Sequence, residues 1–309
     1  MSGARDAPVA EDLAMSPPVV VGVDGSPSSL EAVAVAAREA RLRGCGLKVV
    51  HAFFWPAVHA PLGPWSAATA EEALREVAAR VVTEAVEHAR SVAPGVEVGD
   101  SVVAGGPLTV LEAQSRTAAL VVVGSRGLGG FAGVMLGSTA VHLAAHGRCP
   151  VLVVRDRADG TGPVLLGVDG SPAADAAVEF AFAEAALRGT GVEALHAWTP
   201  WSVPVPPSPD PSEPYALAPG MLADGERRLL AEAVAGRRER YPDVPVVETV
   251  VRGGAREALI GASAKAGVLV VGARGRGGFT GLLLGSVSQA VLHHAHCPVT
   301  VVRGSGDRR

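Results

Sequence analysis

Several absences limit what this 309-residue chain can be. Its three cysteines, Cys45, Cys149 and Cys297, include no Cys-x-x-Cys pair, which fits a reducing compartment and gives no disulfide framework. Lysine occurs only at Lys48 and Lys265, and neither a Lys/Arg run nor the net charge of −4 points to nucleic-acid binding. No apolar run reaches the roughly 18 residues of a membrane helix, and residues 1–14 lack the apolar core of a signal peptide. We therefore expect a soluble cytoplasmic protein with no nucleic-acid or membrane partner.

What the chain does contain is an internal repeat, and its length fits two domains of roughly 150 residues each. The recurring segments are residues 21–27 and 166–172, 51–52 and 196–197, 121–124 and 269–272, 127–131 and 275–279, 136–138 and 284–286, and 149–151 and 297–299. The offset between the copies is 145 residues early in the repeat and 148 residues later. A period this long, with its order preserved, indicates two duplicated domains rather than a solenoid.

Within each copy, apolar β-branched runs alternate with helical patterns. In the first copy we predict strands at residues 19–24, 47–54, 96–103, 120–124 and 151–155, and helices near residues 28–43, 70–92, 107–117 and 138–146. Apolar strands separated by helices predict a five-stranded parallel sheet, flanked by helices, in each copy. The domains would span residues 18–155 and 163–303, with a flexible N-terminus at 1–17, a linker at 156–162 and a flexible C-terminus at 304–309. The Pro-rich stretches 55–69 and 201–219 are predicted to be loops or lids.

Two motifs in each copy fall where ligands bind in such sheets, beyond the carboxyl ends of the strands. One is an aspartate after the first strand, Asp24 or Asp169. The other is a loop after the fourth strand with the pattern Gly-x2-Gly-x9-Gly-Ser, at residues 124–138 and 272–286. We call these two segments the glycine loops. Their glycines permit close backbone approach, the final Gly-Ser opens a helix whose start favours an anion, and an arginine lies inside each loop. The pattern therefore predicts a phosphate site.

The motifs also resemble a known family, the ATP-binding type of universal stress proteins. The resemblance rests on the Val-Asp-Gly-Ser opening, the glycine loop and the closing Cys-Pro-Val-x-Val-Val strand, and it covers nearly the whole chain, once per copy. It implies two tandem Rossmann-like domains of the adenine nucleotide alpha hydrolase-like type. It also implies that backbone groups near Ala52 and Ala197 read adenine, and that the loops hold the phosphates of ATP with the help of Mg²⁺. The candidate ATP-binding residues are Asp24, Ala52, Gly124, Arg126, Gly127, Gly137, Ser138, Thr139, Asp169, Ala197, Gly272, Arg274, Gly275, Gly285, Ser286 and Val287.

Other interpretations of these motifs are weaker. A plain surface loop has no reason to keep one glycine spacing in both copies, although the aspartates are also typical turn formers. His51 and His196 are expected to be buried and hydrogen-bonded rather than catalytic. The histidines beside Cys297 match no zinc spacing and suit a helix C-terminus. Residues 127–132 match a dinucleotide fingerprint but follow the fourth strand, which disfavours a nicotinamide enzyme.

We therefore expect an ATP-binding regulator of stress or dormancy responses that acts with an unidentified regulatory protein. The alternatives are an enzyme with slow ATP hydrolysis or adenylyl or phosphoryl transfer, and an interaction module with degenerate sites. No catalytic base, nucleophile or second acidic residue accompanies the loops, and both copies keep the motif, which favours binding. We also expect the copies to pair through their closing strands, 151–155 and 299–303, since an exposed apolar edge invites pairing. A homodimer is a further expectation.

Overall fold

The computed structural model describes residues 16–53, 64–128, 136–155, 160–171, 174–200, 219–276 and 283–304. The first copy consists of β1 (Val19–Val23), α1 (Pro27–Arg43), β2 (Leu47–Phe53), α2 (Pro64–Val92), β3 (Val98–Ala104), α3 (Pro107–Gln114), β4 (Leu120–Gly124), α4 (Ser138–His146) and β5 (Val151–Val154). The second consists of β6 (Val164–Gly167), α5 (Asp175–Arg188), β7 (Val192–Trp198), α6 (Pro219–Arg240), β8 (Val246–Arg252), α7 (Ala255–Ser263), β9 (Val268–Gly272), α8 (Ser286–His294) and β10 (Val299–Val302).

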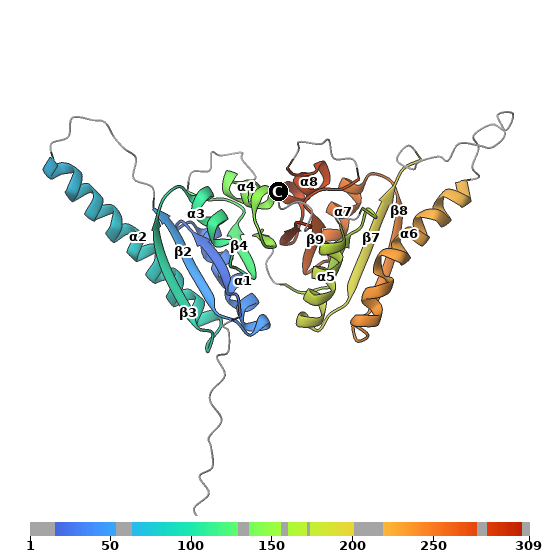
Figure 1. The fold of residues 1–309 in the computed structure, drawn as a ribbon, viewed down its shortest axis with the longest axis horizontal. Helices are drawn as coiled ribbons and strands as arrows, with labels where there is room; N and C mark the ends of the chain where they lie inside the picture. The colour runs from blue at the N-terminus through green and yellow to red at the C-terminus, as the bar shows by residue number, and fades with distance from the viewer. Residues whose placement is uncertain are drawn as a thin grey trace, which may run out of the picture.

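All described strands join one ten-stranded sheet in the order β3-β2-β1-β4-β5-β10-β9-β6-β7-β8. Pairing is parallel within each copy, as the uniformly apolar strands predicted. Strands β1 and β4 are neighbours in the sheet, but the helices that follow them, α1 and α4, lie on opposite faces. The carboxyl ends of these two strands therefore form the topological switch point of the first copy. Figure 1 shows the two halves on either side of the junction, with α2 and α6 on the outer flanks.

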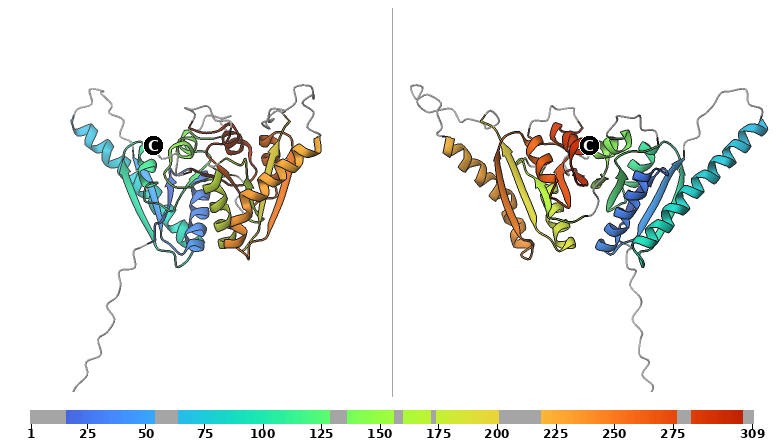
Figure 2. Two further views of the ribbon diagram at one scale, coloured as in Figure 1. Left: turned by 45° about the vertical axis from the view of Figure 1, so that its right-hand side comes forward. Right: turned by 180° about the vertical axis from the view of Figure 1, so that it is seen from behind.

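Two core layers cover the sheet, and the alternation of side chains along each strand explains them. In β1, Val19 and Val21 face the layer formed with α1 and α2, while Val20 faces the layer formed with α3 and α4. The second copy repeats this division, with α5 and α6 on one face and α7 and α8 on the other (Figure 2). The apolar side of α5, which includes Ala177, Val178 and Ala181, is buried.

The element boundaries differ from the sequence prediction mainly at α2. Helix α2 begins at Pro64, so residues 64–69 are helical and their assignment to a loop was wrong. Proline suits the first turn of a helix because the missing N–H has no intrahelical partner there. The same holds for Pro219, which opens α6. The rest of the predicted loops, residues 55–63 and 201–218, lies outside the described residues.

The closing strands of the two copies pair antiparallel at the centre of the sheet, which confirms the predicted junction. Val153 lies opposite Val299, and Val151 lies opposite Val301. All four side chains are almost fully buried. Each strand ends the sheet of its own copy, so the pairing removes both exposed apolar edges.

Two arginines just after these strands reach into the opposite copy. The guanidinium of Arg155 donates to the Leu292 carbonyl at 2.5 Å, near the end of α8. Arg303 donates in the same way to the Ala145 carbonyl, near the end of α4. The last carbonyls of a helix have no intrahelical donor, so each arginine caps a helix of the other copy.

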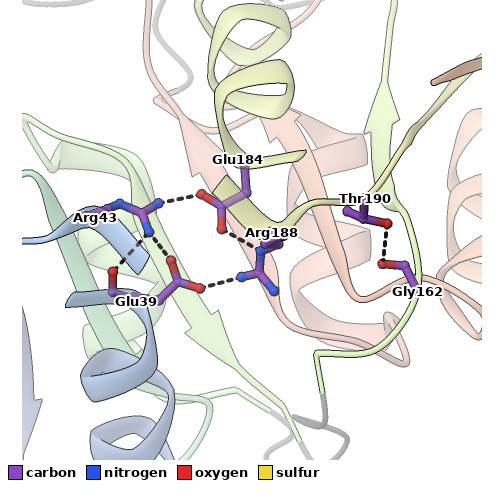
Figure 3. A network of polar contacts seen from close by, with 6 residues as sticks. All are labelled: Glu39, Arg43, Gly162, Glu184, Arg188 and Thr190. Carbon is purple, nitrogen blue, oxygen red and sulfur yellow. Dashed lines mark hydrogen bonds and ion pairs between the residues drawn. The ribbon is translucent and has the colours of Figure 1, made fainter. Parts of the chain in front are cut away.

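A second junction contact, formed by Glu39 and Arg43 of α1 and by Glu184 and Arg188 of α5, lies at the other side of the sheet (Figure 3). Each arginine contacts both glutamates, and both glutamates are 2% exposed. We call these four residues the charge network. The Glu39–Arg43 pair of α1 and the Glu184–Arg188 pair of α5 occupy equivalent positions in the repeat. The two helices therefore contact each other through equivalent surfaces. Among the described helices, none is both long and apolar enough to cross a membrane.

Candidate functional site

In the first copy, the aspartate after β1 ties the strand end to the glycine loop. The carboxylate of Asp24 accepts hydrogen bonds from the Ser26 N–H at 3.0 Å and from the Leu128 N–H at 2.9 Å. Burial alone would raise the pKa of the Asp24 carboxyl, but hydrogen bonds from Ser26, Leu128 and Ser29 outweigh it and lower the pKa. Asp24 is therefore a charged anchor for the loop.

The second copy contains the same anchor, and in both copies the anchoring aspartate explains why the middle residue of the loop is glycine. Asp169 accepts a hydrogen bond from the Arg276 N–H at 2.8 Å, where Asp24 accepts one from Leu128. A Cβ on Gly127 would overlap the Asp24 carboxylate, and a Cβ on Gly275 would overlap that of Asp169. These glycines are thus required for internal packing, a reason that the sequence interpretation, which invoked ligand approach, did not contain.

The first glycine of the loop also serves packing. A Cβ on Gly124 would lie 2.6 Å from the hydroxyl and 2.7 Å from the carbonyl oxygen of Ser28, in the first turn of α1. The absence of a side chain lets α1 begin against the end of β4. Gly272 holds the equivalent half-buried position at the end of β9.

The last glycine of the loop behaves differently, because it caps α4. Gly137 has φ −73° and ψ 151°, and its N–H donates to the Ser125 carbonyl at 2.8 Å. A Cβ on Gly137 would lie 3.6 Å from that oxygen, an ordinary contact. No side chain among the described residues caps the helix. Ser138 instead occupies the first helical position and is exposed.

The start of α8 has the same geometry. Gly285 caps it with φ −74° and ψ 157°, and its N–H donates to the Ala273 carbonyl at 2.8 Å. The exposed Ser286 and half-buried Val287 follow, as Ser138 and Thr139 do in α4. The first-turn N–H groups of a helix have no intrahelical acceptor, so both starts offer donors toward the glycine loops. Residues 129–135 and 277–282, the middle of each loop, lie outside the described residues.

Positive charge gathers between the two loops at the junction. Burial, followed by the charges of Arg148 and Arg274, lowers the pKa of the Arg303 guanidinium. Burial is the largest cause, and the carboxylate of Glu112 acts in the opposite direction. Arg274 belongs to the second loop, and Arg126, its equivalent, follows Ser125 in the first. Arginines from both copies therefore gather at the junction.

The residues expected to read adenine lie near the carboxyl ends of the second strands. Ala52 and Ala197 are half-buried and pair with Val103 and Val251 of β3 and β8. They occupy the same layer as α4 and α8. The structure thus places one alanine at the same end of the sheet as the glycine loop of its own copy.

The histidines before these alanines are hydrogen-bonded, as predicted, but only His196 is also buried, while His51 is half-buried. His51 Nδ1 lies 2.8 Å from the Val23 carbonyl oxygen, and His196 Nδ1 lies 2.7 Å from that of Val168. The His196 ring also contacts the Glu226 carboxylate through Nε2, at 2.5 Å, and both side chains are buried.

The sequence analysis did not identify Glu226. Its counterpart in the first copy is Ala78, which is also buried, so Glu226 is a feature of one copy only. A charged residue at an otherwise apolar position of α6 was the available signal.

Cysteine and metal chemistry find little support in the described residues. Burial raises the pKa of the Cys149 thiol to about 12, which keeps it protonated. Within the described part of the chain, no group of three or more histidine, cysteine, aspartate or glutamate residues is arranged to hold a metal ion. The histidines before Cys297 instead end helix α8 at His293 and His294, as expected.

Comparisons with known proteins agree with this architecture. The sequence model described as the universal stress protein family matches residues 15–155 and again residues 161–303. A universal stress protein of Mycolicibacterium smegmatis is 40% identical over 295 residues, which cover 92% of this chain and 96% of that protein. A universal stress protein of Mycobacterium tuberculosis is 40% identical over 301 residues, covering 93% of this chain and 97% of the relative.

The fold is also found in solved structures. A universal stress protein from Archaeoglobus fulgidus superposes with a TM-score of 0.66 at 18% identity. The superposition covers 93% of this chain and 98% of that structure. At this identity the similarity concerns the fold, and it includes both copies of the repeat.

Proposed function

Because the chain belongs to the universal stress protein family, we propose that it binds ATP, with one site in each copy, and regulates a stress or dormancy response through the occupancy of those sites. The observation that carries the proposal is the pair of helix starts at α4 and α8, which no described side chain caps, beside a junction where arginines of both copies gather. Phosphates suit this place, because they accept hydrogen bonds from helix N–H groups and from arginine.

The phosphate groups are placed by the glycine loops in this proposal. The first-turn N–H groups and the Ser138 hydroxyl donate to one triphosphate, and Ser286 does the same in the second copy. Arg126 and Arg274 add charge to the two sites. Charge-assisted hydrogen bonds of this type contribute about 1.5–3 kcal/mol each, which is enough for tight binding when several form together.

The nucleoside occupies the region between the aspartate and the second strand. Asp24 and Asp169 accept a hydrogen bond from a ribose or adenine donor, while backbone groups near Ala52 and Ala197 contact the base. Both aspartates are already fixed by hydrogen bonds to the glycine loops. The nucleotide therefore binds a carboxylate that is already in place, and its binding is coupled to the conformation of the glycine loop.

A divalent cation completes the ligand. Mg²⁺ is bound largely by phosphate oxygens and water, with one or two protein carboxylates at most. The described residues provide no metal cluster of their own, which suits an ion that arrives with the triphosphate. The same observation favours binding with little turnover.

Native mass spectrometry of the freshly purified full chain tests this proposal. We expect a mass increase that corresponds to ATP, up to two molecules per chain, and its loss after denaturation and refolding without nucleotide. Bound ADP that accumulates from added ATP would instead indicate an ATP-hydrolysing enzyme. A chain that carries no nucleotide and takes up none at millimolar ATP would contradict the proposal.

The regulatory role requires partners, for which the paired copies offer one rigid surface. We propose that the two sites act together on an unidentified regulatory protein, and that the chain also forms a homodimer. Size-exclusion chromatography with light scattering, with and without ATP, tests the homodimer. A monomer mass under both conditions would contradict it.

A further inference from the structure

The second copy contains a groove that the nucleotide proposal does not use. It lies between α5 and α6, has a volume of about 820 Å³, and extends to Arg276 at the end of the described part of the glycine loop. Its apolar walls include Leu229 and Ala233 of α6, and its charged residues are Asp175, Arg228, Glu232, Arg237 and Arg276. A groove of this size is within the range of small-molecule sites.

Arg276 directs its charge into the groove rather than toward the helix start at α8. Its main-chain N–H donates to Asp169, which fixes the backbone. Its guanidinium lies over Gly170, beside Leu229. Both side chains come so close to Gly170 that a Cβ there would overlap them. Gly170 has a φ of +69°, a conformation that suits glycine, so the turn leaves room for the arginine.

The cations of the groove are only partly neutralised. Arg237 forms ion pairs with Asp175 at 2.5 Å and with Glu179 at 3.4 Å. The guanidinium of Arg228 donates to the main-chain carbonyl of Asp224 at 3.4 Å. Within the part of the chain that the structure describes, neither Arg228 nor Arg276 forms an ion pair with a carboxylate. Two guanidiniums therefore remain available to an anion.

The first copy lacks these features at the equivalent positions. Residues Asp175, Gly225, Arg237 and Arg276 of the second copy correspond to Leu30, Val77, Ala89 and Leu128 of the first. Ala89 is fully buried and Leu128 is 72% exposed. Of the charged lining, Asp175, Arg237 and Arg276 are thus specific to the second copy, whereas Arg228 has an arginine counterpart, Arg80, and the glycine loop is common to both copies. The packing of the shared fold therefore does not require these charged residues of the second copy.

We propose that this groove binds a small organic phosphate. Arg228 and Arg276 neutralise the phosphate dianion, because guanidinium groups form strong paired hydrogen bonds with phosphate oxygens. The organic body lies on the apolar side chains of Leu229 and Ala233. Since Arg276 belongs to the second glycine loop, the ligand also contacts the segment that Asp169 anchors. One copy thereby carries a ligand site that the other does not.

A fluorescence titration of the full chain with 1-naphthyl phosphate tests the site. We expect one site per chain, and at least tenfold weaker binding in each of two variants, Arg276→Leu and Gly225→Val. Both variants carry the first-copy residue, and a Cβ on Gly225 meets nothing within 4 Å, so both should fold. Arg80→Ala, which removes the exposed first-copy counterpart of Arg228, is the charge-matched control and should bind normally.

Further titrations separate the groove from other sites. Inorganic phosphate and 1-naphthol should each bind at least tenfold more weakly, because each contributes half of the recognised chemistry. The double variant Gly137→Val/Gly285→Val should bind 1-naphthyl phosphate as the wild type does. The proposal is overturned by undetectable binding at millimolar probe, by equal binding in Arg276→Leu and the wild type, or by loss of binding in the glycine-loop double variant.

Discussion

The charge network between α1 and α5 makes a quantitative prediction about the junction. Replacing Arg43 by methionine keeps an unbranched apolar side chain but leaves Glu39 and Glu184 with one arginine between them (Figure 3). Both glutamates are 2% exposed, so water does not screen the excess negative charge. Breaking a buried ion pair in this way costs about 3–5 kcal/mol. We expect the free energy of unfolding of Arg43→Met to fall by about that amount.

The loss should also depend on pH in a defined direction. Burial and the neighbouring Glu184 raise the pKa of Glu39 above its usual value. A carboxyl with a raised pKa in the folded state stabilises that state most below its unfolded pKa, and this stabilisation is lost as the pH rises through the folded pKa. Without Arg43 the pKa rises further. The difference between Arg43→Met and the wild type should therefore shrink as the pH falls toward 4.5, the ordinary value for this group.

Urea unfolding followed by circular dichroism at several pH values measures both effects. The matched control replaces the whole network with Leu at positions 39 and 184 and Met at positions 43 and 188. Apolar replacements of a complete buried network are neutral or stabilising by about 1–4 kcal/mol. A loss below about 1 kcal/mol in Arg43→Met, equal at pH 5 and pH 8, would refute the reasoning, because it would mean that water reaches these charges.

Three further predictions concern other contacts. Glu226→Ala removes the partner of the buried His196 and should lower the free energy of unfolding by about 1–3 kcal/mol, measured in urea; an unchanged value would mean that the pair is not buried in solution. The lowered pKa of Asp24 means that its carboxylate stabilises the fold at pH values above 3.8, the ordinary pKa of aspartate, and that this stabilisation is lost as the pH falls. Acid should therefore destabilise the wild type more steeply with falling pH than it destabilises Asp24→Asn. Identical acid-unfolding curves would contradict this. Aspartate at both Val153 and Val301 should separate the copies, giving a larger radius in X-ray scattering with unchanged far-UV circular dichroism; an unchanged envelope would show that the strands do not hold the junction.

Much of the fold could be predicted because local patterns decide it. The apolar strands β1 and β4 are buried on both faces, and such strands are visible as uniform Val and Leu runs. Pairing of β5 with β10 followed from a similar argument, since each closes a copy with an apolar edge. The helical start at Pro64 was missed because proline signals both a loop and a first helical turn.

The sequence pattern named the residues of the candidate site, but it did not show the contacts that the structure gives them. Gly127 was recognised by spacing, while its contact with Asp24 requires two segments that lie far apart in the chain. The charge network was also missed, although the Glu39–Arg43 and Glu184–Arg188 pairs recur at the repeat offset. Sequence alone does not say which face of a helix meets another copy, so charges at helical spacing are naturally assigned to solvent.

The central claim is that each glycine loop holds one nucleotide, and Gly137 and Gly285 test it most cleanly. Both have extended backbone angles that suit valine, and a Cβ on either meets only ordinary contacts. Valine therefore crowds the phosphate without straining the fold, which Gly127 would not permit.

Isothermal titration calorimetry with Mg²⁺ and ATP, on protein freed of nucleotide, supplies the measurement. The account predicts two sites per wild-type chain, one in Gly137→Val or Gly285→Val, and none in the double variant, with unchanged circular dichroism throughout. Two sites retained in a correctly folded double variant would contradict it.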